Sequence, residues 1–180
     1  KPLVVRLYLP PCFDQGAQDN YPLIVLLHGQ SFNDDQWDRL GVIEMADKLI
    51  MAGDSPPFII AMPREEYYLQ DPAETGFGEA IIYTLVPWLE TNYAVCAERS
   101  CKAIGGISRG AAWAVRLGYI HWDMFGAIGG HSFPPFKNDI FNLPYWLKAF
   151  PAAERPALYL DIGIHDPYLR PNIDFHEKFI

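Results

Sequence analysis

Long apolar runs are missing from this 180-residue sequence, and basic residues are in the minority. No stretch reaches the roughly 20 apolar residues needed to cross a bilayer, so the sequence predicts no membrane span. Lys and Arg number 14 against 22 for Asp and Glu, which gives a net charge of −8. This balance argues against nucleic acid and anionic membrane as partners. The composition leaves the oligomeric state open.

Metal-binding patterns are also missing. The three cysteines contain no CxxC pair, and the five histidines contain no H-E-x-x-H spacing, so neither a metal nor a cofactor is predicted. Cys96 and Cys101 have two interpretations: half-buried thiols, or a disulfide across a short loop.

The compartment stays open at this stage. No signal peptide is visible, but the chain opens directly on a strand-like run, so a processed or trimmed N-terminus is expected. A disulfide would favour an extracellular or cell-envelope location.

The sequence does contain a regular alternation of short apolar runs and helix-like segments. The apolar runs lie at 3–9, 23–27, 58–62, 103–107, 125–128 and 157–162, and the helix-like segments at 39–52, 79–89, 109–119 and 171–179. Continuous apolar runs are typical of strands buried on both faces, and intervening helices are typical of parallel crossovers. The sequence therefore predicts an α/β fold with a mostly parallel sheet flanked by helices on both faces, formed by residues 1–180 as one domain. Pro87 is expected to kink or end the second helix.

The sharpest motif is the pentad from Gly106 to Gly110, which reads G-x-S-x-G around Ser108. It follows an apolar run and precedes a helix of small residues, as in the strand–turn–helix context of a nucleophile elbow. The glycines leave room for a sharp turn, and the N-terminus of the next helix favours a developing oxyanion. Ser108 is therefore the expected nucleophile, and the alternative is a glycine-rich turn with an idle serine.

A second motif, His28-Gly29-Gln30, follows the first strongly buried run. The hydrolase fold places one oxyanion donor on the loop after such a strand and another just after the nucleophile. The backbone N–H groups of Gln30 and Arg109 are therefore the expected donors. His28 is interpreted as a hydrogen-bonded structural residue, because it precedes Ser108 in a fold whose order is Ser, acid, His.

These residues resemble the Putative esterase branch of the α/β-hydrolases, which includes esterase D-like and feruloyl-esterase-like enzymes. The matching segments are 8–11, 26–29 with Trp37, 85–90 with Tyr93, 103–110, 125–127 and 161–166. The chain departs from the family at Ala111, where a second glycine is usual, and at Thr84, where an acidic residue is common. The resemblance implies serine ester hydrolysis by a Ser-His-Asp triad through an acyl-enzyme. It also implies a catalytic histidine on a loop well beyond the acid.

The acid is expected to be Asp166, which follows a strand-like run and a glycine turn, with Asp161 inside the run as the alternative. His131 is a candidate for lining the substrate pocket, although a satisfied loop histidine is equally compatible with its position. His176 falls in a predicted helix that leads away from the sheet edge. No histidine of the sequence is a good base, so the base is expected beyond Ile180. The domain is accordingly expected to be truncated at its C-terminus, without its last strand and histidine loop, and residues 1–180 alone are expected to show near-background turnover.

Three functional hypotheses follow. The first is a carboxylic ester hydrolase that acts on small-molecule or saccharide esters. The second is an acyltransferase with the same triad, in which an alcohol replaces water as the acceptor. The third is a non-catalytic binding domain on a hydrolase scaffold, which only the missing histidine favours.

Overall fold

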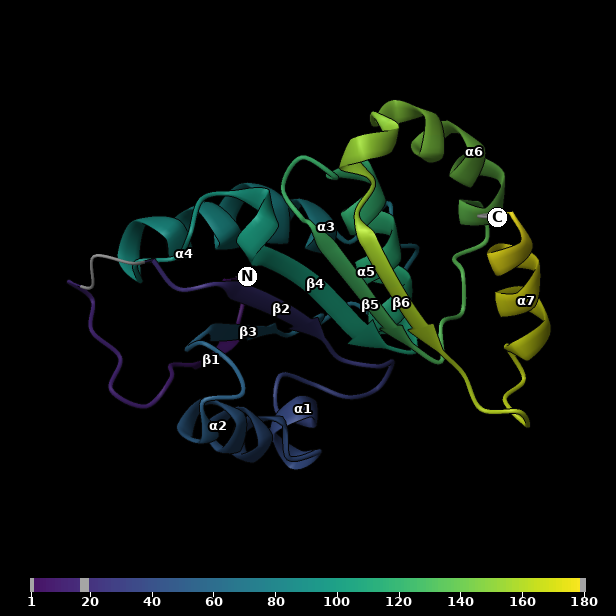
Figure 1. Cartoon of the computed structure of the whole chain (residues 1–180). Helices are drawn as coiled ribbons and strands as arrows, with labels where there is room; N and C mark the ends of the chain where they lie inside the picture. The colour runs from purple at the N-terminus through teal and green to yellow at the C-terminus, as the bar shows by residue number, and fades with distance from the viewer. Residues whose placement is uncertain (1, 17–19, 179–180) are drawn as a thin grey trace.

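The structure is a computed structural model that describes residues 2–16 and 20–178. Six strands form one sheet in the order β1-β3-β2-β4-β5-β6, in which β1 is antiparallel to β3 and all other pairs are parallel (Figure 1). The strands are β1 (Val5–Tyr8), β2 (Leu23–Leu27), β3 (Ile59–Pro63), β4 (Lys102–Ile107), β5 (Ala127–His131) and β6 (Ala157–Asp161). This topology confirms the predicted α/β fold with a mostly parallel sheet.

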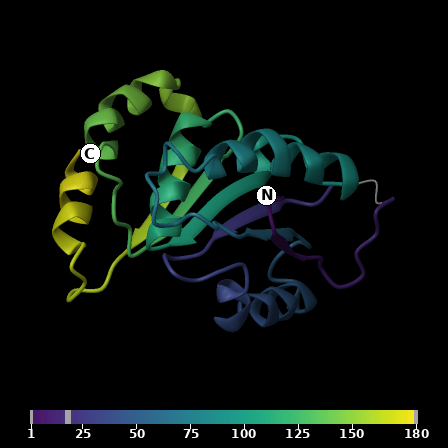
Figure 2. The ribbon, with the colours of Figure 1, turned by 180° about the vertical axis from the view of Figure 1, so that it is seen from behind.

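Helices lie on both sides of the sheet. They are α1 (Gln36–Arg39), α2 (Val42–Ala52), α3 (Phe77–Ala80), α4 (Val86–Asn92), α5 (Arg109–Ile120), α6 (Asp139–Ala149) and α7 (Leu169–Glu177). Viewed from the front and from behind, α1 and α2 lie below the sheet and α3 and α4 above it (Figures 1 and 2). Helix α7 starts two residues before the predicted position, and Phe179, where its end was predicted, lies outside the described residues. Among the described residues, no helix is long and apolar enough to span a membrane.

The main hydrophobic core lies between the sheet and helices α3, α4 and α5. Helix α5 packs closely against β4 and β5 because its inner face carries small residues. A Cβ atom added at Gly118 would lie 2.5 Å from the side chain of Ile128, so a larger residue there would push the helix off the sheet. This close packing fixes the start of α5 relative to the end of β4.

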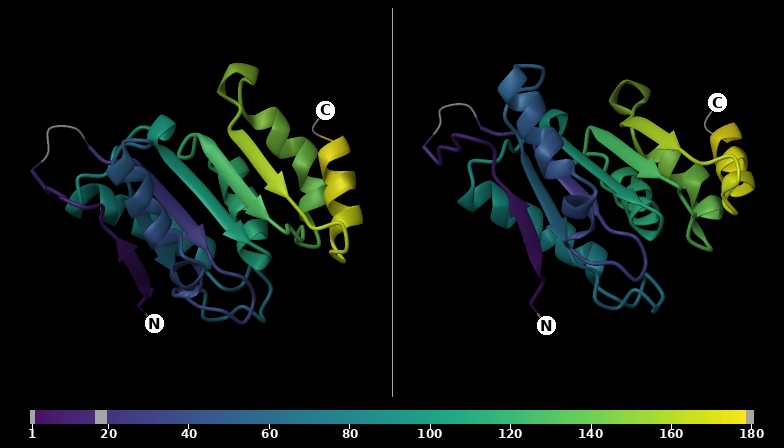
Figure 3. Two further views of the ribbon diagram at one scale, coloured as in Figure 1. Left: turned by 60° about the horizontal axis from the view of Figure 1, so that its bottom comes forward. Right: turned by 90° about the horizontal axis from the view of Figure 1, so that it is seen from below.

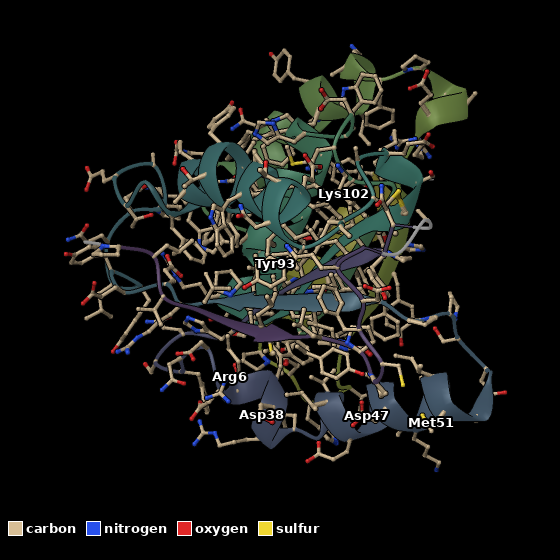
Figure 4. The ribbon with its side chains drawn as sticks, turned by 90° about the vertical axis from the view of Figure 1, so that its left-hand side faces the viewer. Arg6, Asp38, Asp47, Met51, Tyr93 and Lys102 are labelled. Atoms are coloured by element: carbon tan, nitrogen blue, oxygen red, sulfur yellow. A yellow bond between two sulfur atoms is a disulfide. The ribbon has the colours of Figure 1, made fainter. Side chains whose placement is uncertain are left out.

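The smaller core, on the other face, covers only part of the sheet. Helices α1 and α2 are joined to β1 by an Arg6–Asp38 ion pair of 2.8 Å and by a 2.7 Å hydrogen bond from the Tyr8 hydroxyl to Asp47 (Figure 4). Seen from below, these helices lie over β2 and β3 and leave β5 and β6 uncovered (Figure 3). Tyr159 of β6 is accordingly 60% exposed. The expectation of strands buried on both faces is therefore right for β3 and wrong for β6, whose residues alternate.

Pro87 does not end its helical segment. Helix α3 passes through a π-helical turn (Ile81–Leu85) into α4, where Pro87 occupies the first turn. The wider π turn thus separates two helices, and the second continues to Asn92, beyond the predicted end.

Cys96 and Cys101 form a disulfide, which confirms the second of the two interpretations. The bond closes a short loop that leads through a 3-10 turn (Arg99–Cys101) into β4, the strand that ends at Ser108. Disulfides are typical of proteins outside the reducing cytoplasm.

Replacing both bonded cysteines by alanine is expected to lower the free energy of unfolding by about 2 kcal/mol, because the unfolded chain regains the loop entropy of a five-residue separation. Urea unfolding followed by circular dichroism measures this difference. Cys12→Ser is the matched control, since Cys12 is an exposed free thiol. Equal midpoints for the double variant and the wild type would show that the bond does not constrain the protein.

Candidate active site

Ser108 lies in a strained turn between β4 and α5. Its backbone has φ of 53° and ψ of −123°, a region that non-glycine residues rarely occupy and that is found at functional sites. Its N–H donates to the carbonyl of His131 over 2.8 Å, and its carbonyl accepts from Ala112 in α5. The serine is thereby held at the carboxyl edge of the sheet, at the N-terminus of α5.

Both glycines of the pentad are required by close backbone approaches. A Cβ atom at Gly106 would lie 2.2 Å from the carbonyl carbon of Gly110, and one at Gly110 would lie 2.2 Å from the Leu27 carbonyl oxygen. Real Cβ atoms do not approach other atoms this closely, so any other residue would force the turn apart. The motif is thus explained by the geometry of the turn that presents Ser108.

The loop after β2 lies beside Ser108. A Cβ atom added at Gly29 would lie 3.6 Å from the Cβ of Ser108. The Gly29 N–H donates to the buried Oε1 of Gln36 over 2.7 Å, so this N–H already has a protein partner. The next N–H along the chain belongs to Gln30, an exposed residue. The indole of Trp37 donates to the Leu27 carbonyl over 3.0 Å and holds the base of this loop.

His28 is buried and both of its ring nitrogens are occupied. Nδ1 donates to the Gly29 carbonyl, and Nε2 accepts from the N–H of Glu65, each over 2.8 Å. Burial lowers the pKa of His28 and keeps the ring neutral, as the accepting role of Nε2 requires. The geometry agrees with the interpretation of His28 as a structural residue.

The side chain of Arg109 binds Glu65. Its Nε and one terminal nitrogen each lie 2.7 Å from a different carboxylate oxygen, and the same terminal nitrogen lies 3.3 Å from the Gln70 carbonyl. The guanidinium also lies 5.3 Å from the centre of the Phe136 ring. Sequence reasoning missed Glu65. The only signal for it is its place just after β3, at the sheet edge where Ser108 lies.

Asp166 lies on the loop after β6. Its carboxylate accepts hydrogen bonds from the Ser132 hydroxyl and, over 2.8 Å, from the Tyr168 N–H. Ser132 directly follows β5, so the loop after β6 is joined to the end of the strand next to β4. This is the region of the sheet edge where a catalytic acid is expected.

Asp161 has different surroundings from those that its sequence context suggested. It is the last residue of β6, and its side chain is 48% exposed rather than enclosed in an apolar strand. Both of its carboxylate oxygens accept from Nδ1 of His131 over 2.9 Å, and one also accepts from the Tyr159 hydroxyl. Asp161 and His131 therefore form a pair on the sheet face that α1 and α2 leave uncovered.

The structure does not assemble a triad from the described residues. Among the described residues, 2–16 and 20–178, no histidine ring hydrogen-bonds to the side chain of Ser108 or Asp166. His121 lies at the C-terminal end of α5, at the other end of the sheet, and both His165 and His176 are exposed. His131 lines an apolar hollow of about 310 Å³ together with Trp37 and Gly105, and Ser108 is not among its lining residues.

Comparisons with known proteins identify the family of the chain. The family model described as Putative esterase matches residues 1–172. The chain is 27% identical over 169 residues to Esterase Rv1288 of Mycobacterium tuberculosis, covering 88% of this chain and 34% of that protein. It is 28% identical over 137 residues to an endo-1,4-beta-xylanase/feruloyl esterase of Xylanibacter ruminicola, covering 69% of this chain and 18% of that protein. The chain thus spans about a third or less of the curated relatives that it matches.

A solved ferulic acid esterase superposes with a TM-score of 0.80 at 24% identity. The superposition covers 97% of this chain and 78% of that structure. The likeness establishes the fold and places the chain's sheet and helices in the α/β-hydrolase arrangement.

Proposed function

The chain belongs to the Putative esterase family, and on that premise we propose that the protein hydrolyses carboxylic esters with Ser108 as its nucleophile. The observation that carries the proposal is the strained backbone of Ser108, held between β4 and the N-terminus of α5 and beside the loop of Gly29. Strain of this kind persists only where surrounding structure enforces it, and it is common at catalytic turns. The resemblance that the sequence predicted is confirmed by the family match.

The proposed mechanism has two steps. The Ser108 oxygen bonds to the ester carbonyl carbon while its proton passes to a histidine base, and the carbonyl oxygen becomes an oxyanion. The N–H groups of Gln30 and Arg109 stabilise that oxyanion, and its collapse expels the alcohol, which takes the proton from the histidine. Water then attacks the acyl-enzyme by the same route, which releases the carboxylic acid and restores the Ser108 hydroxyl.

Asp166 is proposed as the acid that orients the histidine. Asp161 is disfavoured because its carboxylate already binds His131 on a sheet face. The base is proposed to be a histidine that the described residues do not include, because none of their histidine rings hydrogen-bonds to the side chain of Ser108 or Asp166. The 180 residues are proposed to form one domain.

For the substrate we propose an ester of an aromatic acid, either with a small alcohol or with a saccharide. The support comes from relatives that are named feruloyl or ferulic acid esterase. An acyltransferase with the same residues is the second candidate. The lack of a histidine ring bonded to Asp166 among the described residues is the one observation that favours a third candidate, a non-catalytic binding domain.

Methyl ferulate and p-nitrophenyl acetate, offered to the full-length protein, separate these candidates. We expect ferulate and methanol as the products, released in equal amounts without an added acceptor. If turnover required an added alcohol or sugar and yielded a new ester, the transferase would replace the hydrolase. No turnover and no acyl-enzyme in a mass spectrum would leave the binding domain as the function.

A further inference from the structure

Glu65 connects the two loops that are proposed to stabilise the oxyanion. It lies on the loop after β3 and is 3% exposed. Its backbone N–H donates to Nε2 of His28 on the loop after β2, and its carboxylate binds the side chain of Arg109 at the start of α5. One buried residue is therefore bonded to both loops at once.

Through His28, Glu65 is connected to the peptide unit between Gly29 and Gln30. Nδ1 of His28 donates to the carbonyl of Gly29, and that carbonyl belongs to the same planar peptide as the N–H of Gln30. In a trans peptide these two groups point in opposite directions, so holding the carbonyl fixes the direction of the N–H. The bond from Glu65 to Nε2 holds the ring that makes this contact.

On the side of Arg109, the connection anchors the residue that carries the other donor. Two parallel bonds of 2.7 Å between a guanidinium and a carboxylate have a defined plane and direction, unlike a single ion pair. The Ser108 carbonyl, in the same peptide unit as the Arg109 N–H, accepts from Ala112 in the first turn of α5. The two bonds to Glu65 therefore hold this peptide against the loop after β3, and the bond from Ala112 holds it against its own helix.

We propose that Glu65 is a positioning residue that holds the Gln30 and Arg109 N–H groups at the mutual geometry needed to bind an oxyanion. It touches no substrate and acts through His28 and Arg109. The oxyanion part of this role depends on the proposed function, whereas the coupling of the two loops does not. A buried carboxylate that only balanced the charge of Arg109 would affect α5 and leave the loop of Gly29 unchanged.

The test compares Glu65→Gln with Glu74→Gln in the full-length protein. Glu74 is exposed and lies on the same loop, so the control makes the same chemical change without a buried partner. Amide hydrogen exchange by NMR is expected to speed up at least tenfold at Gly29 and Glu65 in Glu65→Gln. In steady-state assays with p-nitrophenyl acetate, kcat is expected to fall 10- to 100-fold while KM stays within twofold. Glu74→Gln is expected to match the wild type in both measurements.

Because Glu65→Gln leaves a buried guanidinium without its counter-charge, it can fail to fold. The double variant Glu65→Gln/Arg109→Gln removes both charges, so neither is left without its counter-charge. It is expected to show the same faster exchange at Gly29 and the same loss of kcat, since both variants lack the bonds between the Glu65 carboxylate and the Arg109 guanidinium. Wild-type exchange rates at Gly29 in whichever variant folds would overturn the proposal. A wild-type protein that hydrolyses no ester would instead reject the proposed function, while the exchange rates would still decide whether Glu65 couples the loops.

Discussion

Ser108→Ala is expected to lower ester turnover by the full-length protein on the order of 10⁶-fold in kcat, the loss seen when a serine hydrolase loses its nucleophile. Without the hydroxyl no acyl-enzyme forms, and only binding and oxyanion stabilisation remain. Release of p-nitrophenol from p-nitrophenyl acetate measures the loss. Circular dichroism and thermal unfolding should match the wild type, because alanine fits the space of serine and the turn depends on Gly106 and Gly110.

Ser132→Ala is a matched control for this substitution. Ser132 also follows a strand directly and has a positive φ of 53°, but its hydroxyl binds Asp166 and lies in the turn after β5. We expect it to retain far more turnover than Ser108→Ala. Comparable rates for wild type and Ser108→Ala would remove Ser108 from the mechanism.

Asp166→Asn is expected to lower kcat on the order of 10³- to 10⁴-fold, the second-largest effect. An amide in place of the carboxylate leaves the shape nearly unchanged but no longer stabilises the imidazolium that forms when Ser108 is deprotonated. Asp161→Asn is the matched control, because it makes the same change on the same strand–loop segment. Its half-exposed pair with His131 should contribute less than about 1 kcal/mol to stability, and kcat should change less than threefold.

The ranking of these two variants decides between the carboxylates. This ranking is obtained by measuring kcat of both variants with p-nitrophenyl acetate. Unfolding curves show that both variants fold. A larger loss for Asp161→Asn would transfer the acid role to Asp161 and make His131 its histidine partner. Equal, small losses would mean that neither carboxylate assists the base.

Features encoded by neighbouring residues could be predicted from the sequence. The fold class, the family and the disulfide of Cys96 and Cys101 are confirmed. The elbow was recognisable because both glycines are imposed by contacts within five residues or with the adjoining strand end. Local steric requirements of this kind leave a motif that can be read without a structure.

Features that depend on distant partners could not be predicted. Glu65 and Arg109 are 44 positions apart, and nothing in either residue's surroundings marks them as a pair. Asp161 looked buried because its neighbours are apolar, but β6 is an edge strand and one of its faces has no helix over it. The sequence predicts that Pro87 kinks or ends its helix. It gives no sign of the π turn that precedes Pro87, because that turn depends on packing against the core.

Covalent labelling with a fluorophosphonate tests the central assignment most directly. The full-length protein is incubated with the probe and then digested. Tandem mass spectrometry locates the adduct. A single adduct on Ser108, absent from Ser108→Ala and much slower to form in Asp166→Asn, is the predicted result. An adduct on any other residue, or none on a protein that hydrolyses p-nitrophenyl acetate, would contradict the assignment of Ser108 as the nucleophile.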